Sequence, residues 1–210
     1  MKRPLFVSLD GPKGTGKTTL LEALTQALRA RGHKVIRLCE KKSDPQRGET
    51  MALINQLARQ PDPALELHVC QRMAESRAWI TQHVLPRQPN DSIVLIDRWY
   101  PSDAAFRPTL PFAQILALNL ERGVQVPDLH VGVVTAAQVS WARAAARSRG
   151  LNSTVMHRFE EHLASTLAFE RAAIDQGWLL CRNEGPVALS TSQVADAILR
   201  VVQHTSGLSS

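Results

Sequence analysis

The stretch SLDGPKGTGKTTLLEAL, residues 8–24, decides the fold of this chain. Gly11, Gly16, Lys17 and Thr18 fit the spacing G-x-x-x-x-G-K-S/T, with Gly14 a further glycine inside the loop. A β-rich apolar run precedes the pattern, and an amphipathic helical pattern follows it. Glycines let backbone N–H groups turn toward an anionic phosphate, and the N-terminus of the next helix adds its dipole. The stretch therefore predicts a phosphate-binding loop.

The same loop predicts its ligands. Lys17 is expected to reach the β- and γ-phosphates of a nucleoside triphosphate, and the Thr18 hydroxyl is expected to bind Mg²⁺. An ordinary glycine-rich turn before a helix is the alternative, which the agreement of pattern and context disfavours. The expected cofactors are ATP and Mg²⁺. The residues expected to bind the nucleotide are Gly11, Pro12, Lys13, Gly14, Thr15, Gly16, Lys17, Thr18 and Thr19.

Composition indicates one domain with anionic partners. The 210 residues are 44% hydrophobic, which suits one well-buried domain and is short for two. We expect a single domain over residues 1–204 and a disordered tail over 205–210, because the tail is small, polar and terminal. The formal net charge of +6 favours partners such as nucleotides or nucleic acid.

Cysteine usage and hydropathy favour a cytoplasmic protein. Cys39, Cys70 and Cys181 are widely spaced and match no metal-ligand pattern, so we expect neither disulfides nor zinc. No uninterrupted apolar run approaches the ~20 residues that span a bilayer. We therefore expect no membrane partner.

Short apolar runs alternate with longer segments of helical periodicity along the chain. This rhythm is typical of a parallel sheet wrapped by helices, so the expected fold class is α/β, in three layers, with a five-stranded parallel sheet flanked by helices. The expected strands are 5–9, 34–39, 93–96, 129–134 and 178–181. The expected helices are 17–31, about 50–59, 64–85, 111–122, 136–149, 155–176 and 192–203.

A second informative stretch is SIVLIDRWYPSDAAFR, residues 92–107. It begins as a buried strand that ends in Asp97 and Arg98. Ligands of doubly wound sheets bind beyond the carboxyl ends of the strands, so both side chains should face the same crevice as the glycine loop. A carboxylate there can bind Mg²⁺ or hold a hydroxyl, and a guanidinium can hold phosphate in a bidentate fork. A structural Asp–Arg ion pair is the alternative.

Residues 3 to about 202 resemble the thymidylate kinase-like branch of the nucleoside monophosphate kinase family. The family element D-R-Y/H/W-x-x-S-x-x-A-Y/F is matched in order by Asp97, Arg98, Trp99, Ser102, Ala105 and Phe106. VPDLHVGVV, residues 126–134, is similar to the family strand P-D-L-T-x-x-L. The resemblance implies a P-loop kinase fold with an Arg-rich lid at about 143–158. It also implies that Arg77 helps to hold the acceptor.

The expected lid carries closely spaced arginines. Arg143 and Arg147 lie four residues apart on one helix face. Their like charges repel by roughly a few tenths of a kcal/mol unless an anion binds. Arginines that close over a transferring phosphoryl group raise its rate by orders of magnitude. A solvated basic helix face is the alternative. The resemblance implies that one of them is catalytic and leaves open which.

The chain departs from the family around the acceptor. Where the family usually reads T-R-E-P-G-G, this chain reads LCEKK at 38–42, and the arginine is missing. Lys41 or its neighbour could substitute, although a flexible ammonium does not reproduce a planar bidentate grip. Met73 stands where the family usually stacks a phenylalanine on thymine. In the glycine loop, Lys13 stands at a position that is usually acidic in the family, and Asp10 at one that is usually glutamate. A kinase of altered substrate is therefore favoured.

Two kinds of acceptor fit these residues. If the acceptor is a phosphate, Glu40 and Asp97 would position Mg²⁺ or sugar hydroxyls; if it is a hydroxyl, a carboxylate takes its proton. Glu40 directly follows a strand, as the base does in the related deoxynucleoside kinases. The expected catalytic residues are Lys17, Glu40, Asp97, Arg98, Arg143 and Arg147. The expected substrate-binding residues are Lys41, Met73, Arg77, Trp99, Ser102 and Phe106, and Thr18 and Asp97 are expected to hold Mg²⁺.

These observations favour a Mg-ATP-dependent kinase that transfers the γ-phosphoryl group to a nucleotide-like acceptor. The leading acceptor is a pyrimidine deoxynucleoside monophosphate. One alternative is a hydroxyl on a hydroxymethylpyrimidine in phage-type modified DNA, which the basic charge and the missing arginine favour. Another is a nucleotide-sensing module without turnover. The resemblance also implies a possible homodimer, because family members commonly pair through helices beside the sheet.

Overall fold

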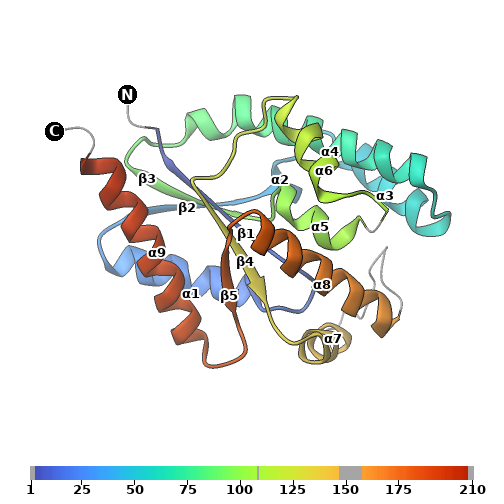
Figure 1. The fold of residues 1–210 in the computed structure, drawn as a ribbon. Helices are drawn as coiled ribbons and strands as arrows, with labels where there is room; N and C mark the ends of the chain where they lie inside the picture. Colours follow the sequence, from blue (N-terminus) through green and yellow to red (C-terminus); the bar gives the residue numbers. More distant parts are fainter. Residues whose placement is uncertain (1–2, 108, 147–157, 208–210) are drawn as a thin grey trace.

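Five parallel strands form the central layer of the computed structural model, which describes residues 3–107, 109–146 and 158–207 (Figure 1). The strand order is β2-β3-β1-β4-β5. The strands are β1 (Leu5–Asp10), β2 (Lys34–Cys39), β3 (Ser92–Asp97), β4 (Leu129–Val134) and β5 (Leu179–Arg182). Every pairing is parallel, so all five strands end at the same edge. The expected α/β fold with a five-stranded parallel sheet is confirmed.

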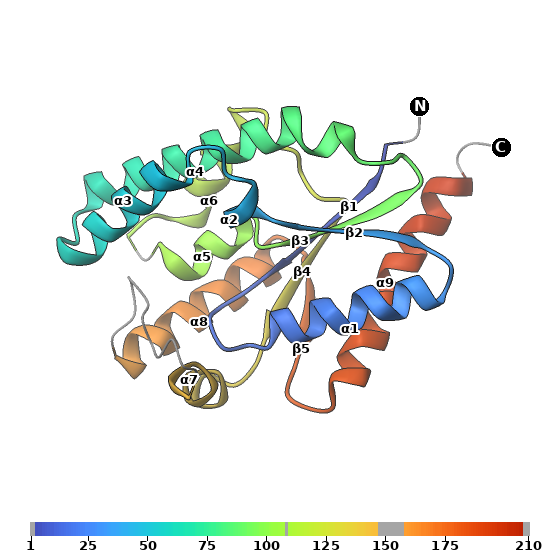
Figure 2. The same cartoon turned by 180° about the vertical axis from the view of Figure 1, so that it is seen from behind.

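Helices cover both faces of the sheet (Figures 1 and 2). One face carries α1 (Lys17–Ala30) and α9 (Val187–Gly207). The other carries α4 (Pro63–His83), α6 (Phe112–Leu120) and α8 (Phe159–Asp175), with α3 (Arg47–Arg59) packed on α4. The remaining described helices are α2 (Glu40–Ser43), η1 (Leu85–Arg87), η2 (Tyr100–Ser102), α5 (Asp103–Phe106) and α7 (Ala137–Ala145).

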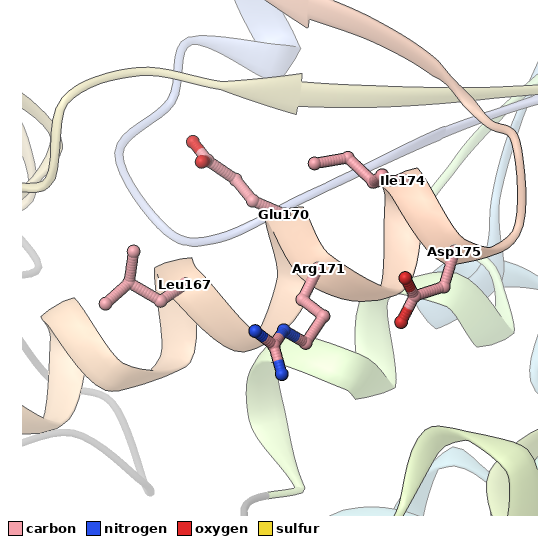
Figure 3. A pocket seen from close by; sticks show the side chains of 5 residues that line it. All are labelled: Leu167, Glu170, Arg171, Ile174 and Asp175. Carbon is pink, nitrogen blue, oxygen red and sulfur yellow. The ribbon is translucent and has the colours of Figure 1, made fainter.

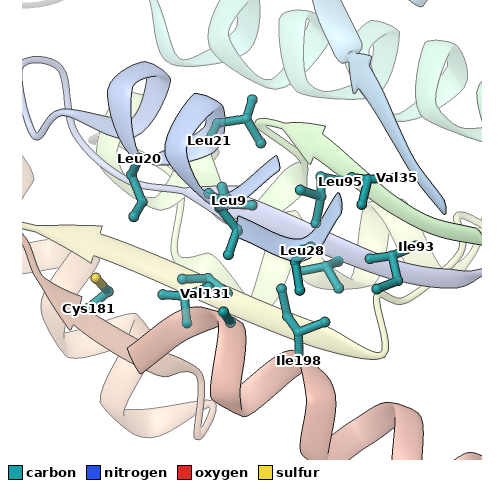
Figure 4. Close-up of a cluster of buried hydrophobic side chains, with 14 of the residues drawn as sticks. Leu9, Leu20, Leu21, Leu28, Val35, Ile93, Leu95, Val131, Cys181 and Ile198 are labelled. Atoms are coloured by element: carbon teal, nitrogen blue, oxygen red, sulfur yellow. The ribbon is translucent and has the colours of Figure 1, made fainter. Parts of the chain in front are cut away.

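The alternation of side chains along the strands supplies two cores. In β1, Val7 and Leu9 face α1 and α9, whereas Phe6 faces α4. Both faces of the strands are apolar, as is typical of a parallel sheet covered on both sides. Figure 4 shows the first core, whose labelled residues are Leu9, Leu20, Leu21, Leu28, Val35, Ile93, Leu95, Val131, Cys181 and Ile198.

Local sequence explains the buried face and the C-terminal end of α1, the helix that follows the glycine loop. Leu20, Leu24 and Leu28 lie four residues apart, which places one apolar stripe on the sheet. Gly32 ends the helix in the left-handed region at φ 85° and donates to the Arg29 carbonyl, while the next N–H donates to the Leu28 carbonyl. This Schellman motif satisfies the last carbonyls. The helix therefore ends at a defined turn before β2.

The observed elements differ from the expected ones in two short helices and in the ends of longer ones. α2 and α5 were not expected, because helices of four residues show no periodicity. α9 begins at Val187 instead of Ser192, directly after Pro186, which suits a helix start. It continues to Gly207, although disorder was expected from Thr205. Within the described residues, no helix has both the length and the apolar character needed to cross a membrane.

Candidate nucleotide and acceptor site

The carboxyl edge of the sheet gathers most of the predicted site residues. β1 runs into the glycine loop after Asp10, β2 runs into Glu40, and β3 ends at Asp97. Asp97 pairs in register with Leu9 of β1 and with Cys39 of β2. The three strand ends are therefore adjacent, as is expected of a binding crevice in a doubly wound sheet.

The glycines of the loop are required by close contacts as well as by their φ angles. Gly11, Gly14 and Gly16 all have positive φ, at 142°, 85° and 85°. A Cβ atom on Gly14 would lie 2.0 Å from the Ser140 carbonyl oxygen, and one on Gly11 would lie 2.2 Å from that of Val133. The loop thus packs against α7 and β4 so closely that no side chain fits at these two positions.

Lys17 lies buried in the curve of the loop. Its Nζ donates to the carbonyl oxygens of Gly11 and Pro12 at 2.8 and 2.6 Å, and it lies 3.3 Å from Thr15 Oγ1. The ammonium is thereby held where the loop would enclose phosphate oxygens. Lys13 is half-buried, and Thr18 and Thr19 are exposed in the first turn of α1.

Arg143 of α7 lies near the glycine loop and is connected to it through Asn183. Asn183, directly after β5, donates from Nδ2 to the Thr15 carbonyl at 2.9 Å. Arg143 donates from Nη1 to the Asn183 carbonyl at 3.4 Å, and this nitrogen is 4.0 Å from a Cβ built on Gly16. No motif or spacing in the sequence points to Asn183. Arg147 and most of the expected lid at about 143–158 lie outside the described residues.

Asp10 fixes the segment that follows Arg98. Its Oδ1 accepts from the backbone N–H groups of Trp99 and Ser102 at 2.8 and 3.1 Å and from Ser102 Oγ at 2.7 Å. Burial raises the pKa of Asp10, and its Oδ2 is buried without a hydrogen-bond partner. Ser102, expected to bind substrate, instead donates its hydroxyl to Asp10, because η2 turns it toward the end of β1.

Arg98 connects the glycine loop with Phe106. Its backbone is left-handed, with φ 70°, which is uncommon for a residue other than glycine. Its Nη1 donates to the Gly11 carbonyl at 3.1 Å, and its guanidinium lies 4.7 Å from the centre of the Phe106 ring. Two predicted residues, one catalytic and one substrate-binding, are therefore in contact.

Trp99 does not line this site. Its side chain is fully buried in the second core, edge-to-face with Phe6, and its Nε1 donates to the Gln125 carbonyl at 3.0 Å. The expectation that it contacts the acceptor is therefore wrong for the described conformation, because the indole fills the space beneath α4 and α6.

A buried ionic cluster lies where the acceptor is expected. Arg77 of α4 is fully buried and donates from Nε to Glu40 Oε1 at 2.6 Å and from Nη1 to Asp103 Oδ2 at 2.7 Å. Nη1 also lies 3.3 Å from Asn119 Oδ1, while Nη2 is buried without a hydrogen-bond partner. Sequence reasoning missed Asp103 and Asn119, although Asp103 directly follows Ser102 of the recognised element.

The cluster has one carboxylate more than it has cations, and burial has the largest effect on its protonation. Burial raises the pKa of Glu40 to about 7; Arg77 opposes the shift, and the charge of Asp103 adds to it. The two carboxylates together raise the pKa of Arg77, which therefore stays charged. At neutral pH the cluster can hold or release a proton at Glu40.

Two further cations flank the cluster. Arg107 is buried and donates from Nη2 to the sulfur of Met73 at 3.2 Å and from Nη1 to the Phe106 carbonyl at 3.0 Å. Its Nε is buried without a hydrogen-bond partner. Met73 is half-buried, one turn before Arg77 on α4, and Lys41 is exposed beside Glu40. The sequence left open whether Arg107 replaces the arginine that is missing from the acceptor contact.

Mg²⁺ carried by a nucleotide fits the oxygen atoms at the strand edge. Among the described residues, no group of three or more His, Cys, Asp and Glu side chains is arranged to hold a metal ion. Mg²⁺ bound to phosphates needs only one or two protein ligands, because it keeps several waters. The exposed Thr18 hydroxyl, the half-buried Asp97 carboxylate and the unpartnered Oδ2 of Asp10 are suitable ligands.

A pocket on α8 contains none of these residues (Figure 3). It is lined by Leu167, Glu170, Arg171, Ile174 and Asp175, which all belong to one helix. Leu167 and Ile174 are 56% and 64% exposed, so the pocket is a feature of the outer surface of this helix. It is no part of the candidate site.

A parallel sheet whose first strand enters a helix through a glycine-rich phosphate-binding loop defines a P-loop nucleotide-binding protein. The family model described as Thymidylate kinase matches residues 9–189, and the chain belongs to this family. It is 28% identical to the Thymidylate kinase of Geobacter sulfurreducens over 216 residues, which cover 94% of this chain and 97% of that protein.

Matches to other relatives cover less of their length. The Thymidylate kinase of Gluconobacter oxydans is 32% identical over 103 residues, 49% of this chain and 47% of that protein. That of Leptospira interrogans is 30% identical over 131 residues, 61% of this chain and 62% of that protein. The chain therefore spans about half to three fifths of the length of these two relatives. The resemblance expected from the sequence is confirmed at the level of the family.

Proposed function

We propose that this protein transfers the γ-phosphoryl group of ATP to a pyrimidine deoxynucleoside monophosphate. The observation that carries this proposal is the contact of Arg98 with Gly11, since it joins the donor loop to the acceptor side of the sheet edge. Membership in the thymidylate kinase family supports the same reaction.

Different residues bind the donor phosphates and stabilise the transferring group. Backbone N–H groups of the glycine loop and Lys17 bind the donor phosphates, and Arg143 approaches them from α7. Arg98 stabilises the charge of the transferring group, because its guanidinium lies between the loop and Phe106. Thr18 and Asp97 would hold Mg²⁺, which would neutralise charge at the phosphate oxygens.

The acceptor nucleoside lies against the half-buried Met73, one turn before Arg77 on α4. A monophosphate is already ionised at neutral pH, so its attack needs no general base. The buried cluster then orients the acceptor, and the cations beside the phosphate are Arg98 and the exposed Lys41.

A second candidate is transfer to a hydroxyl group, such as that of a hydroxymethylpyrimidine in DNA. One observation favours it: the pKa of Glu40 is raised to about 7, which suits a general base at neutral pH. In this reaction Glu40 takes the hydroxyl proton as the oxygen attacks the γ-phosphorus and ADP leaves.

A transfer assay with γ-labelled ATP and Mg²⁺ separates these functions. The acceptors are deoxynucleoside monophosphates, nucleosides and DNA that contains hydroxymethyluracil, with Lys17→Ala as the inactive control. We expect label on a pyrimidine monophosphate, with Glu40→Gln losing less than about tenfold in kcat. Label on a hydroxyl acceptor, with a loss of about 100-fold or more in Glu40→Gln, supports the second candidate.

One outcome contradicts both candidates. If the wild-type protein binds ATP but transfers label to none of these acceptors, it is better described as a nucleotide-sensing module. Binding of nucleic acid, homodimer formation and cytoplasmic localisation stay predictions of the sequence.

A further inference from the structure

A buried serine–histidine pair joins α7 to α8 outside the residues assigned to the reaction. Ser140 Oγ lies 2.7 Å from His162 Nε2, and the two residues are 0% and 1% exposed. The same hydroxyl lies 3.1 Å from the Ala137 carbonyl, which can take its hydrogen. Ser140 then accepts from His162 Nε2–H, which defines the tautomer of the imidazole.

Ser140 also supports the glycine loop. Its carbonyl oxygen is the atom that would lie 2.0 Å from a Cβ on Gly14, so α7 and the loop are in van der Waals contact at this residue. Figure 2 shows α7 beside the segment that connects β1 with α1. A shift of α7 toward or away from the loop therefore changes the contact between Ser140 and Gly14.

The position of α7 also decides where Arg143 lies. Arg143 follows Ser140 by three residues, and its Nη1 donates to the carbonyl of Asn183, whose Nδ2 donates to Thr15 of the loop. The side chain of Arg143 is exposed and long, so this single contact at 3.4 Å does not fix it alone. Its placement depends on the backbone of α7, which the His162 contact helps to hold.

We propose that His162 is a positioning residue of the nucleotide site: through Ser140 it holds α7 against the glycine loop and so keeps Arg143 beside the donor phosphates. Burial lowers the pKa of His162, which agrees with a neutral imidazole that donates one hydrogen bond. The ring of Trp141, 5.6 Å away, packs beside the imidazole and limits its rotation. The consequence for ATP rests on the proposed function.

The test compares ATP binding by variants that differ in one N–H group. His162→Phe keeps an aromatic ring beside Trp141 but cannot donate, whereas His162→Gln keeps a donor at a similar reach. We expect His162→Phe to weaken ATP binding about fivefold, the effect of one buried hydrogen bond, and His162→Gln to stay within about twofold of the wild type. Ser140→Ala removes the same contact from the other side and should match His162→Phe.

A double-mutant cycle shows whether Arg143 transmits the effect. In an Arg143→Ala background, His162→Phe should weaken ATP binding no further, because the side chain it positions is gone. Independent fivefold losses that multiply would overturn the proposal. So would a lower melting temperature of His162→Phe with an unchanged Kd for ATP, since this would indicate a structural role only.

Hydrogen exchange in the unliganded protein gives a readout that does not depend on ATP. We expect His162→Phe to accelerate exchange at backbone amides of α7 and of residues 11–16 by about fivefold or more, with α1 beyond its first turn unchanged. Unchanged exchange in both segments would overturn the proposal even if the protein is a kinase. Failure of the wild-type protein to bind ATP would refute the proposed function separately, and exchange would still decide the role of His162.

Discussion

Replacement of Arg77 with methionine is the most informative perturbation of the acceptor region. Arg77 is fully buried and pairs at 2.6 and 2.7 Å with Glu40 and Asp103, so its loss leaves two carboxylates in the interior without a counter-ion. Removal of one partner from a buried ion pair costs about 3–5 kcal/mol. Because domains are stable by only about 5–15 kcal/mol, the variant should lose a large share of its stability.

Urea unfolding followed by circular dichroism measures this loss. At about pH 8, Arg77→Met should lower the free energy of unfolding by about 3–5 kcal/mol, and Arg77→Lys should lower it less because a cation remains. Adding Glu40→Gln and Asp103→Asn to Arg77→Met should recover most of the loss, since no buried charge is then left. A change below about 1 kcal/mol in Arg77→Met would refute the description of the cluster as an ion-paired unit.

Three further predictions follow from the site. Gly14→Ala should abolish measurable ATP binding in a calorimetric titration, because its Cβ would lie 2.0 Å from the Ser140 carbonyl oxygen; wild-type affinity would contradict the contact between the loop and α7. Since the pKa of Glu40 rises from 4.5 unfolded to about 7 folded, its contribution to stability is complete below about pH 4.5 and is lost as the pH rises through about 7. Urea titrations across this range should show that Glu40→Gln removes this part of the decline, and an identical pH profile in the variant would argue against it. Chelation of Mg²⁺ with EDTA should stop phosphoryl transfer and leave the melting temperature unchanged, because no metal cluster supports the described part of the fold; a fall in melting temperature would point to a structural ion.

The parts of the fold that depend on residues close together in the sequence were predictable. The glycine loop, its lysine and the following leucine stripe lie within about one helix length, and the strands are short apolar runs bounded by turn residues. For this reason all five strands were placed to within two residues of their observed ends. The four-residue helices α2 and α5 were missed, because so short a helix is held by its surroundings and has no periodic signal.

The contacts that define the acceptor region were much less predictable. Glu40 and Arg77 were each singled out, but their ion pair joins residues 37 positions apart, and no local pattern shows that they meet. The sequence neighbours of Trp99 predict a place in the site, whereas its side chain enters the core directly after the left-handed residue Arg98. The place of Ser102 in the family element predicts a substrate contact, whereas its hydroxyl donates to Asp10.

The most direct test of the proposed reaction is phosphorus NMR of the protein with ATP, Mg²⁺ and thymidine monophosphate. We predict that resonances of thymidine diphosphate and ADP rise together in equal amounts, and that neither rises with Lys17→Ala. Formation of ADP without thymidine diphosphate, or equal turnover by Lys17→Ala, would contradict transfer from the glycine loop to a pyrimidine deoxynucleotide.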